Sequence, residues 1–161
     1  MGAAAVKGAG VAEGAKPGAA PSFRSAAELR EVLERLLSEV DGDPEVGPRL
    51  RSARVPHRFV FPDVGVVLNV TASERSEHCL RWKFSEEVEW TPALTLEMDS
   101  AVANRYLQGE ENLAIAIARG RIHLACEGAR AALSFLPVSR ALFGRYRAIV
   151  ERDFPHLALP S

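Results

Sequence analysis

The chain has 161 residues, of which 47% are hydrophobic, and it carries a net charge of −1 at pH 7. This length suits one domain with a substantial core, and the near-zero charge argues against a dedicated nucleic-acid binder, which needs a strongly basic field. Two cysteines, Cys79 and Cys126, do not make a disulfide framework, so we expect free thiols in a reducing compartment.

Residues 1–21 are dominated by Ala and Gly, a composition that cannot bury enough apolar surface to offset the entropy lost on ordering. We therefore predict a disordered tail over residues 1–21 and a single domain over residues 22–157. The tail lacks the apolar run of a secretory signal, and no segment has the length needed to cross a bilayer. On these grounds we expect a cytoplasmic protein, and the Ala-, Gly- and Arg-rich composition suggests a bacterial source.

The first predicted helix covers about residues 26–41. Ser25 and Glu28 have the spacing of a capping box, and apolar residues follow at steps of three and four from Leu29 to Val40. Such a stripe is typical of a helix that packs onto a sheet. We expect a packing role here, because the polar face is not enriched in the basic residues of a membrane-surface helix.

Residues 43–56 are predicted to form a loop, because Pro44, Gly47, Pro48 and Pro56 all break regular structure. The segment also brings together Arg49, Arg51, Arg54 and Arg58. These side chains are either solvated or contact a phosphate or an anionic headgroup.

Five segments have the alternation of half-buried strands. In each of them one face is apolar and the other polar, so the helices should cover a single side of the sheet. We therefore predict an α+β fold with a mostly antiparallel sheet of about five strands and helices over one face. The predicted strands are residues 58–61, 63–72, 79–88, 94–98 and 121–127.

Two helices are predicted between the last two strands. Asp99 or Ser100 caps the first, which ends at Gly109. The second covers residues 113–118 and is apolar on almost every side, so we expect it to be buried or to line an apolar space. A further helix follows the last strand over the segment ARAALSFL. A long final helix is predicted over residues 137–154, because proline suits the first turn of a helix.

The order of these elements resembles the sterol carrier protein 2 (SCP2) family of lipid-binding domains. The resemblance rests on the strand TLEMD, the helix ending in YLQG, the apolar helix ending in RG, and the strand RIHLACE leading into ARAALSFL. In that family the final strand usually ends in Gly followed by an acidic or amide residue. Cys126 and Glu127 stand at those places here, and the small residue is displaced to Gly128.

The sequence contains no convincing catalytic or metal-binding motif. His78-Cys79 and His123-x-x-Cys126 are suggestive, but side chains an odd number of residues apart point to opposite faces of a strand. There is also no phosphate-binding Gly-rich loop and no G-x-S-x-G nucleophile motif. We therefore predict no catalytic residues, no metal and no cofactor, and we do not expect an enzyme.

The resemblance implies that a fatty acyl chain, a sterol-like molecule or another hydrophobic ligand binds in an apolar tunnel between the sheet and its helices. Transfer of this ligand between membranes would require a transient contact with a membrane surface, for which the arginines between Arg119 and Arg152 are candidates. The alternative is a protein-interaction or accessory module with a filled core that supports a lipid-modifying enzyme. The predicted lining of the tunnel is Phe84, Leu96, Met98, Leu107, Leu113, Ile117, Phe135, Leu136, Phe143 and Tyr146.

Overall fold

The computed structural model describes residues 21–160, without the side chains of Ala129, Ala132, Phe135, Leu136 and Val138. The tail predicted over residues 1–21 therefore falls almost wholly outside the described residues and stays a prediction. The strands form one sheet in the order β4-β3-β2-β5-β6. They are β2 (His57–Phe61), β3 (Val66–Ala72), β4 (Leu80–Phe84), β5 (Leu94–Met98) and β6 (Ile122–Cys126).

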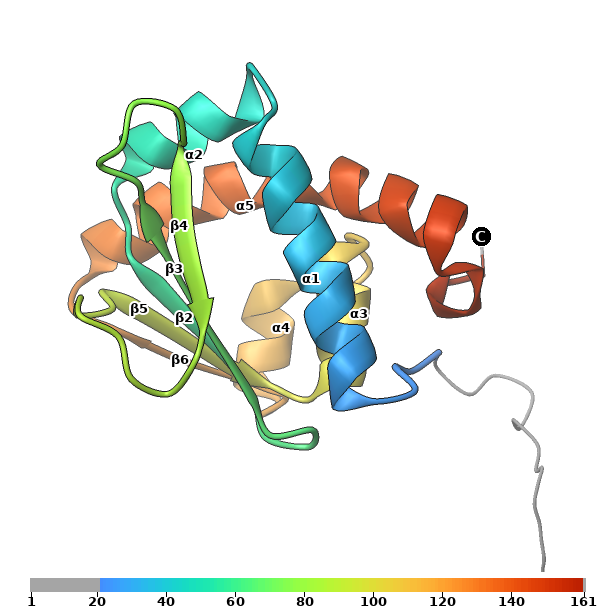
Figure 1. Cartoon of the computed structure of the whole chain (residues 1–161). Coiled ribbons are helices and arrows are strands. Elements are labelled where there is room, and N and C mark those ends of the chain that lie inside the picture. The colour runs from blue at the N-terminus through green and yellow to red at the C-terminus, as the bar shows by residue number, and fades with distance from the viewer. Residues whose placement is uncertain (1–20, 161) are drawn as a thin grey trace, which may run out of the picture.

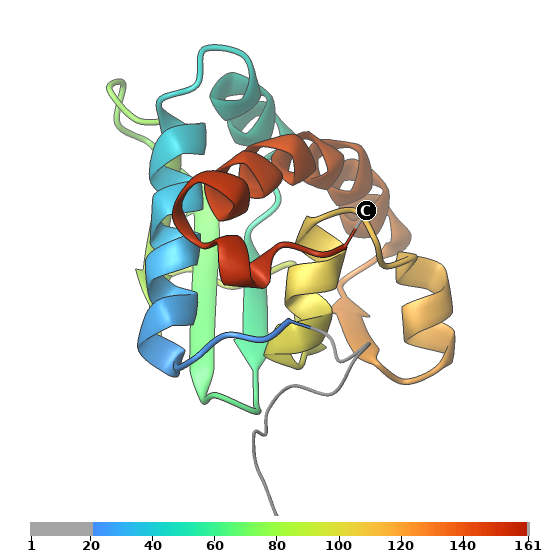
Figure 2. The ribbon, with the colours of Figure 1, turned by 90° about the vertical axis from the view of Figure 1, so that its right-hand side faces the viewer.

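The prediction of a five-stranded, mostly antiparallel sheet is confirmed. The central pair, β2 and β5, is parallel, and the other three pairs are antiparallel. Helices cover one side of this sheet, and α5 lies across α1 and α3 (Figures 1 and 2). The helices are α1 (Ala26–Asp41), α2 (Val46–Ala53), α3 (Ser100–Leu107), α4 (Leu113–Ala118) and α5 (Ala129–Asp153), followed by the 3-10 turn η2 (Pro155–Leu157).

The core lies between the sheet and α1, α3 and α5. Register places Phe59 of β2 beside Leu68 of β3 and Leu96 of β5, so these apolar side chains share one face. Helix α1 lies over this face as predicted, and its Ser25 Oγ accepts a hydrogen bond from the Glu28 N–H at 3.1 Å. The stripe that it buries is Leu29, Val32, Leu33, Leu36, Leu37 and Val40.

The opposite face of the sheet is crossed by the connection from β4 to β5. Asn69 is fully buried there, where its Nδ2 donates to the Ser85 carbonyl at 2.6 Å and its Oδ1 accepts from Arg58 Nε at 2.8 Å. Arg58 also donates to the Glu86 carbonyl. This connection allows β5 to join β2 in parallel, because a parallel neighbour needs a crossover rather than a hairpin.

The loop predicted over residues 43–56 is wrong, because residues 46–53 form helix α2. Pro48 is the third residue of this helix, where an N–H would have no partner within the helix, so proline is tolerated. Asp43 Oδ1 accepts the N–H groups of Glu45 and Val46 at 2.8 and 2.9 Å, which caps the start of the helix. The helix ends at Arg54, whose φ of 51° is left-handed.

The predicted start of the last helix at Pro137 is also wrong. Helix α5 begins at Ala129 and continues through Pro137, so the two predicted helices are one. Proline removes the hydrogen bond to the Leu133 carbonyl, but the good helix formers on both sides keep the helix continuous.

Residues 113–118 were expected to be buried or to line an apolar space, and this expectation is wrong for most of the helix. Only Ala116 of α4 is buried, and Ile115 is 48% exposed. The helix has six residues, and Gly120, with a φ of 75°, turns the chain back into β6 directly after it. A helix this short packs through about one turn, so its remaining apolar side chains stay at the surface.

Candidate functional site

The candidate site is a small hollow within the core, enclosed by the sheet and by α1, α3 and α5. Its volume is about 30 Å³. Strands β2 and β3 supply the floor, and residues three and four apart on α1 supply one wall. The hollow is lined by Leu33, Leu36, Leu37, His57, Phe59, Phe61, Leu68, Val70, Met98, Ala103, Tyr106, Leu107 and Leu142.

The lining carries no charge at neutral pH, although it contains a histidine and a tyrosine. Burial lowers the pKa of His57 to about 4, and its Nδ1 lies 2.9 Å from the Val55 carbonyl. Burial likewise raises the pKa of Tyr106, whose hydroxyl donates a hydrogen bond to Ser139 Oγ at 3.1 Å. The space therefore suits an apolar group and disfavours a charged one.

Tyr106 separates this hollow from a cleft at the surface, because it lines both. The cleft has a volume of about 390 Å³ and lies between α5 and the connection from α3 to α4. The Tyr106 ring meets the Phe143 ring edge to face, with 5.3 Å between the ring centroids. The cleft is lined by Tyr106, Gly109, Glu110, Glu111, Asn112, Leu113, Ser139, Arg140 and Phe143.

The carboxylates of this outer cleft are neutralised by arginines. Glu111, whose side chain is 6% exposed, pairs with Arg105 at 3.2 Å and with Arg121. Burial acts to raise its pKa, but the hydrogen bonds from the two guanidinium groups outweigh burial and leave the pKa below its usual value. Glu110 pairs with Arg147 at 3.0 Å.

A buried hydrogen-bond network holds α3 against α5 and η2 beside the hollow. The Asn104 Nδ2 donates to the Leu157 carbonyl at 2.9 Å, and its Oδ1 accepts from the Tyr146 hydroxyl at 2.7 Å. Gln108 Nε2 donates to the same two acceptors, each at 2.9 Å. Because a buried polar group costs free energy when it lacks a partner, the network fixes this wall of the hollow.

The predicted lining residues are divided among several places. Met98 and Leu107 line the hollow, and Leu113 and Phe143 line the outer cleft. The buried Leu96 and Tyr146 belong to the surrounding core.

Two more of the predicted lining residues lie elsewhere, and two cannot be placed. Phe84 lines a surface hollow near Gly65, and Ile117 of α4 is half-buried and packs at the margin of the core. The side chains of Phe135 and Leu136 fall outside the described ones.

Most of the residues that line the hollow were not among those predicted from the sequence. The aromatic residues Phe59 and Phe61 of β2 and the three leucines of α1 were visible as apolar stripes. What the pattern could not show was that β2 lies at the centre of the sheet, paired in parallel with β5, and therefore under α1 and α3.

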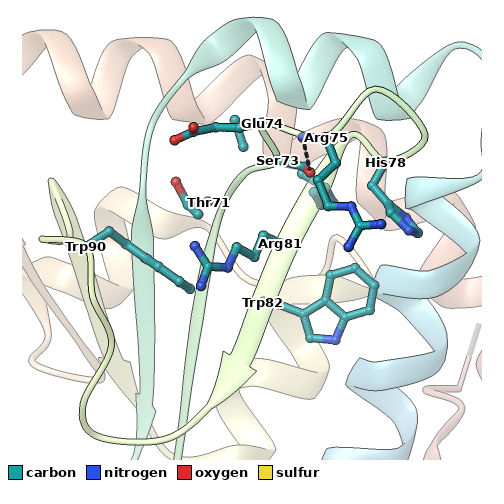
Figure 3. A pocket seen from close by; sticks show the side chains of 10 residues that line it. Thr71, Ser73, Glu74, Arg75, His78, Arg81, Trp82 and Trp90 are labelled. Atoms are coloured by element: carbon teal, nitrogen blue, oxygen red, sulfur yellow. Dashed lines mark hydrogen bonds between the residues drawn. The ribbon is translucent and has the colours of Figure 1, made fainter.

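A second surface cleft, of about 540 Å³, lies beside the edge strand β4. Figure 3 shows Arg81 between Trp90 and Trp82, and its guanidinium carbon lies 4.9 Å from the Trp90 ring centroid. Arg81 pairs with Glu89, and His78 Nδ1 lies 2.7 Å from Asp41 Oδ2, so both side chains are held by carboxylates. The cleft is broad and open. We interpret its aromatic and ionic contacts as structural contacts that stabilise the β4 edge of the sheet.

The described residues offer neither a membrane span nor a metal site. Over residues 21–160, no helix is both long and apolar enough to cross a bilayer. Within the same range, no three His, Cys, Asp or Glu side chains come together as metal ligands. Cys79 is half-buried and Cys126 exposed, and both are free thiols.

No protein-family model matches the chain, and no curated protein matches its sequence. Solved structures do resemble it. A Thermus thermophilus protein described as a candidate sterol carrier protein has a TM-score of 0.56 and 15% identity, over 89% of this chain and 99% of that chain. Sterol carrier protein domain 2 of Helicoverpa armigera has a TM-score of 0.55 and 16% identity, over 80% and 97%. The ubiquinone synthesis protein UbiJ-SCP2 has a TM-score of 0.52 and 15% identity, over 74% and 95%.

These identities are low, so the likeness shows the fold alone. The chain has an SCP2-like α+β fold, as the order of its predicted elements indicated. A weaker likeness, with a TM-score of 0.45, joins it to the inverting sec-alkylsulfatase Pisa1 from a Pseudomonas species. This chain spans 13% of the length of that enzyme, and 55% of this chain is covered.

Proposed function

We propose that this protein binds a hydrophobic ligand, such as a fatty acyl chain or a sterol-like molecule, in the hollow between the sheet and α1, α3 and α5. The observation that carries the proposal is a core space whose lining is apolar and uncharged. The names of the similar structures, which include sterol carrier proteins, support the same class of ligand. Apolar burial at about 25 cal/mol per Å² supplies the binding energy, and no reactive group is needed.

The hollow must widen for such a ligand to enter. Its volume of about 30 Å³ is far below the roughly 300–1,000 Å³ of ligand pockets, so an open tunnel is not present among the described residues. The wall formed by α1 is tied to the edge strand, since Asp41 Oδ1 accepts the N–H groups of Cys79 and Leu80 at 2.6 and 2.8 Å. We therefore place the opening on the opposite side, at Tyr106 and Leu142, next to the outer cleft.

The same small volume favours a second candidate function. A protein-interaction or accessory module with a filled core, supporting a lipid-modifying enzyme, needs no space for a ligand. The core of such a module would stay packed at the density that is normal for protein interiors. The two functions differ in whether any lipid occupies the protein.

Native mass spectrometry of the protein purified from cells, followed by solvent extraction, separates the two candidates. The carrier function predicts a co-purified lipid, or a mass shift when a fatty acid is added. A protein that stays at its apo mass under both conditions contradicts ligand binding and supports the accessory function.

A pair of variants then locates the ligand. Ala103 lines the hollow and is 2% exposed, whereas Ala125 lies exposed on β6. Ala103→Leu adds the same atoms as Ala125→Leu, but it fills the hollow and should abolish uptake, while the control variant binds as the original does. Urea unfolding checks that Ala103→Leu still folds, since overpacking costs about 1–3 kcal/mol. Equal uptake by both variants would place the ligand outside the hollow.

A further inference from the structure

Helix α2 and the first half of α5 lie side by side, although they are far apart in the sequence (Figure 1). A shallow surface hollow runs between them, with Arg49 of α2 on one side and Leu133 and Pro137 of α5 on the other. Because residues 46–53 form a helix rather than a loop, the two segments present one surface.

The exposed stripe of α5 on this surface is basic and apolar. Arg130, Leu133, Pro137 and Arg140 recur at steps of three and four, and all four are exposed. Among the described residues, two large hydrophobic side chains are exposed, and Leu133, at 68%, is the more exposed of the two. An apolar side chain in this position, surrounded by arginines, is typical of an interaction surface.

The charge of this surface is uncompensated. Helix α2 contains no acidic residue, and α5 contains none before Glu151. Elsewhere on the protein Arg121, Arg145, Arg147 and Arg152 pair with carboxylates. Within residues 21–160, no carboxylate lies within ion-pair distance of any of the three arginines that border the hollow or belong to the α5 stripe, namely Arg49, Arg130 and Arg140.

We propose that these three arginines, together with Leu133 and Pro137, form a docking surface for a bilayer that contains anionic lipids. We call it the α2–α5 basic surface. The guanidinium groups match lipid phosphates and carboxylates, and Leu133 enters the boundary between headgroups and acyl chains. A bilayer fits better than a nucleic acid, because Leu133 and Pro137 are aliphatic and none of the described side chains of this surface is an aromatic platform for bases.

The docked orientation also concerns the outer cleft. Arg140 belongs both to the α2–α5 basic surface and to the lining of that cleft, so docking brings the cleft and Tyr106 to the edge of the bilayer. This point alone rests on the proposed ligand-binding function. Docking itself is independent of it, because vesicle binding is measured without any ligand in the protein.

Flotation with vesicles tests the docking surface. The full chain should float with vesicles of phosphatidylcholine and phosphatidylserine, but not with phosphatidylcholine alone, and added salt should weaken the binding. Arg49→Ser combined with Arg130→Ser should lower the partition coefficient about thirty-fold, since each basic residue near the surface contributes about five-fold. Leu133→Ser should lower it about five-fold.

The matched control is Arg30→Ser combined with Lys83→Ser. It removes the same charge from two exposed positions on α1 and β4, away from the surface, and should leave the partition coefficient unchanged. The proposal is overturned if the original chain does not float with the anionic vesicles, or if the two double variants lose binding equally. It is also overturned if Leu133→Ser binds normally while the chain prefers duplex DNA or an acidic peptide, because the partner is then a polyanion.

Discussion

The neutral state of buried His57 makes the stability of this protein depend on pH in a predictable way. Burial lowers the pKa of His57 from 6.5 to about 4. Below pH 6.5 the unfolded chain therefore takes up a proton that the folded protein does not, so stability falls as the pH falls from 6.5 towards 4. The full loss is about 3 kcal/mol, and the part between pH 7 and pH 5 is about 2 kcal/mol.

Urea unfolding at pH 7 and pH 5 measures this loss, with the free energy of unfolding extrapolated to water. His57→Gln keeps an N–H that can bond to the Val55 carbonyl but cannot take up the proton, so its stability should fall by about 2 kcal/mol less than that of the original protein. Other groups that titrate over this interval cancel in the comparison. His123→Gln, at an exposed position of β6, is the matched control and should behave as the original.

The reasoning about His57 is refuted if His57→Gln and the original protein lose the same stability between pH 7 and pH 5. A direct titration of the His57 ring protons by NMR gives an independent reading. A folded-state pKa near 6.5 would mean that the ring is hydrated, and that the hollow beside it is open to water rather than apolar and closed.

Four further substitutions test how the elements around the hollow are held, each through urea unfolding. Asn104→Leu removes the acceptor of the buried Tyr146 hydroxyl, while the Leu157 carbonyl keeps its hydrogen bond from Gln108, and should cost about 1–3 kcal/mol. An unchanged midpoint would deny the network any role. Gly47→Ala places a methyl group 2.9 Å from the Val40 carbonyl oxygen and should cost about 1–3 kcal/mol. Its control is Gly144→Ala, whose methyl group meets nothing within 4 Å and should stabilise α5 by about 0.5–1 kcal/mol. Asp41→Ala removes the acceptor of two N–H groups at the start of β4 and should lower the free energy of unfolding by about 2 kcal/mol. If the same substitution at an exposed aspartate lowers it more, the anchoring of α1 by Asp41 is contradicted.

Local patterns predicted the secondary structure well where a single period dominates. The stripe of α1 and its cap at Ser25 are found as expected, and so are the alternating faces of β3 and β5. The errors occurred where a proline was taken as a boundary. Pro48 stands in a first turn and Pro137 lies inside a helix, and neither outcome is visible without the neighbouring helices.

The candidate site was harder to predict than the fold, because its lining depends on which strands pair with one another rather than on the local pattern of apolar residues. An apolar residue such as Met98 lines the hollow, while Leu96, two residues away on the same face of β5, lies in the surrounding core. The apolar composition of α4 was misleading in the same way. Nothing in its six residues shows that one side of the helix, which packs beside β6, remains exposed to solvent.

The parallel pairing of β2 with β5 has a consequence for the order in which the chain folds. Strands β2, β3 and β4 are neighbours both in sequence and in space, so they can assemble through short-range antiparallel contacts. The central seam joins residues much further apart in the sequence, and such non-local parallel pairing forms more slowly. An early three-stranded assembly would therefore leave the edge of β2 unpaired, and the rate at which β5 arrives should limit how long newly made chains remain prone to aggregate.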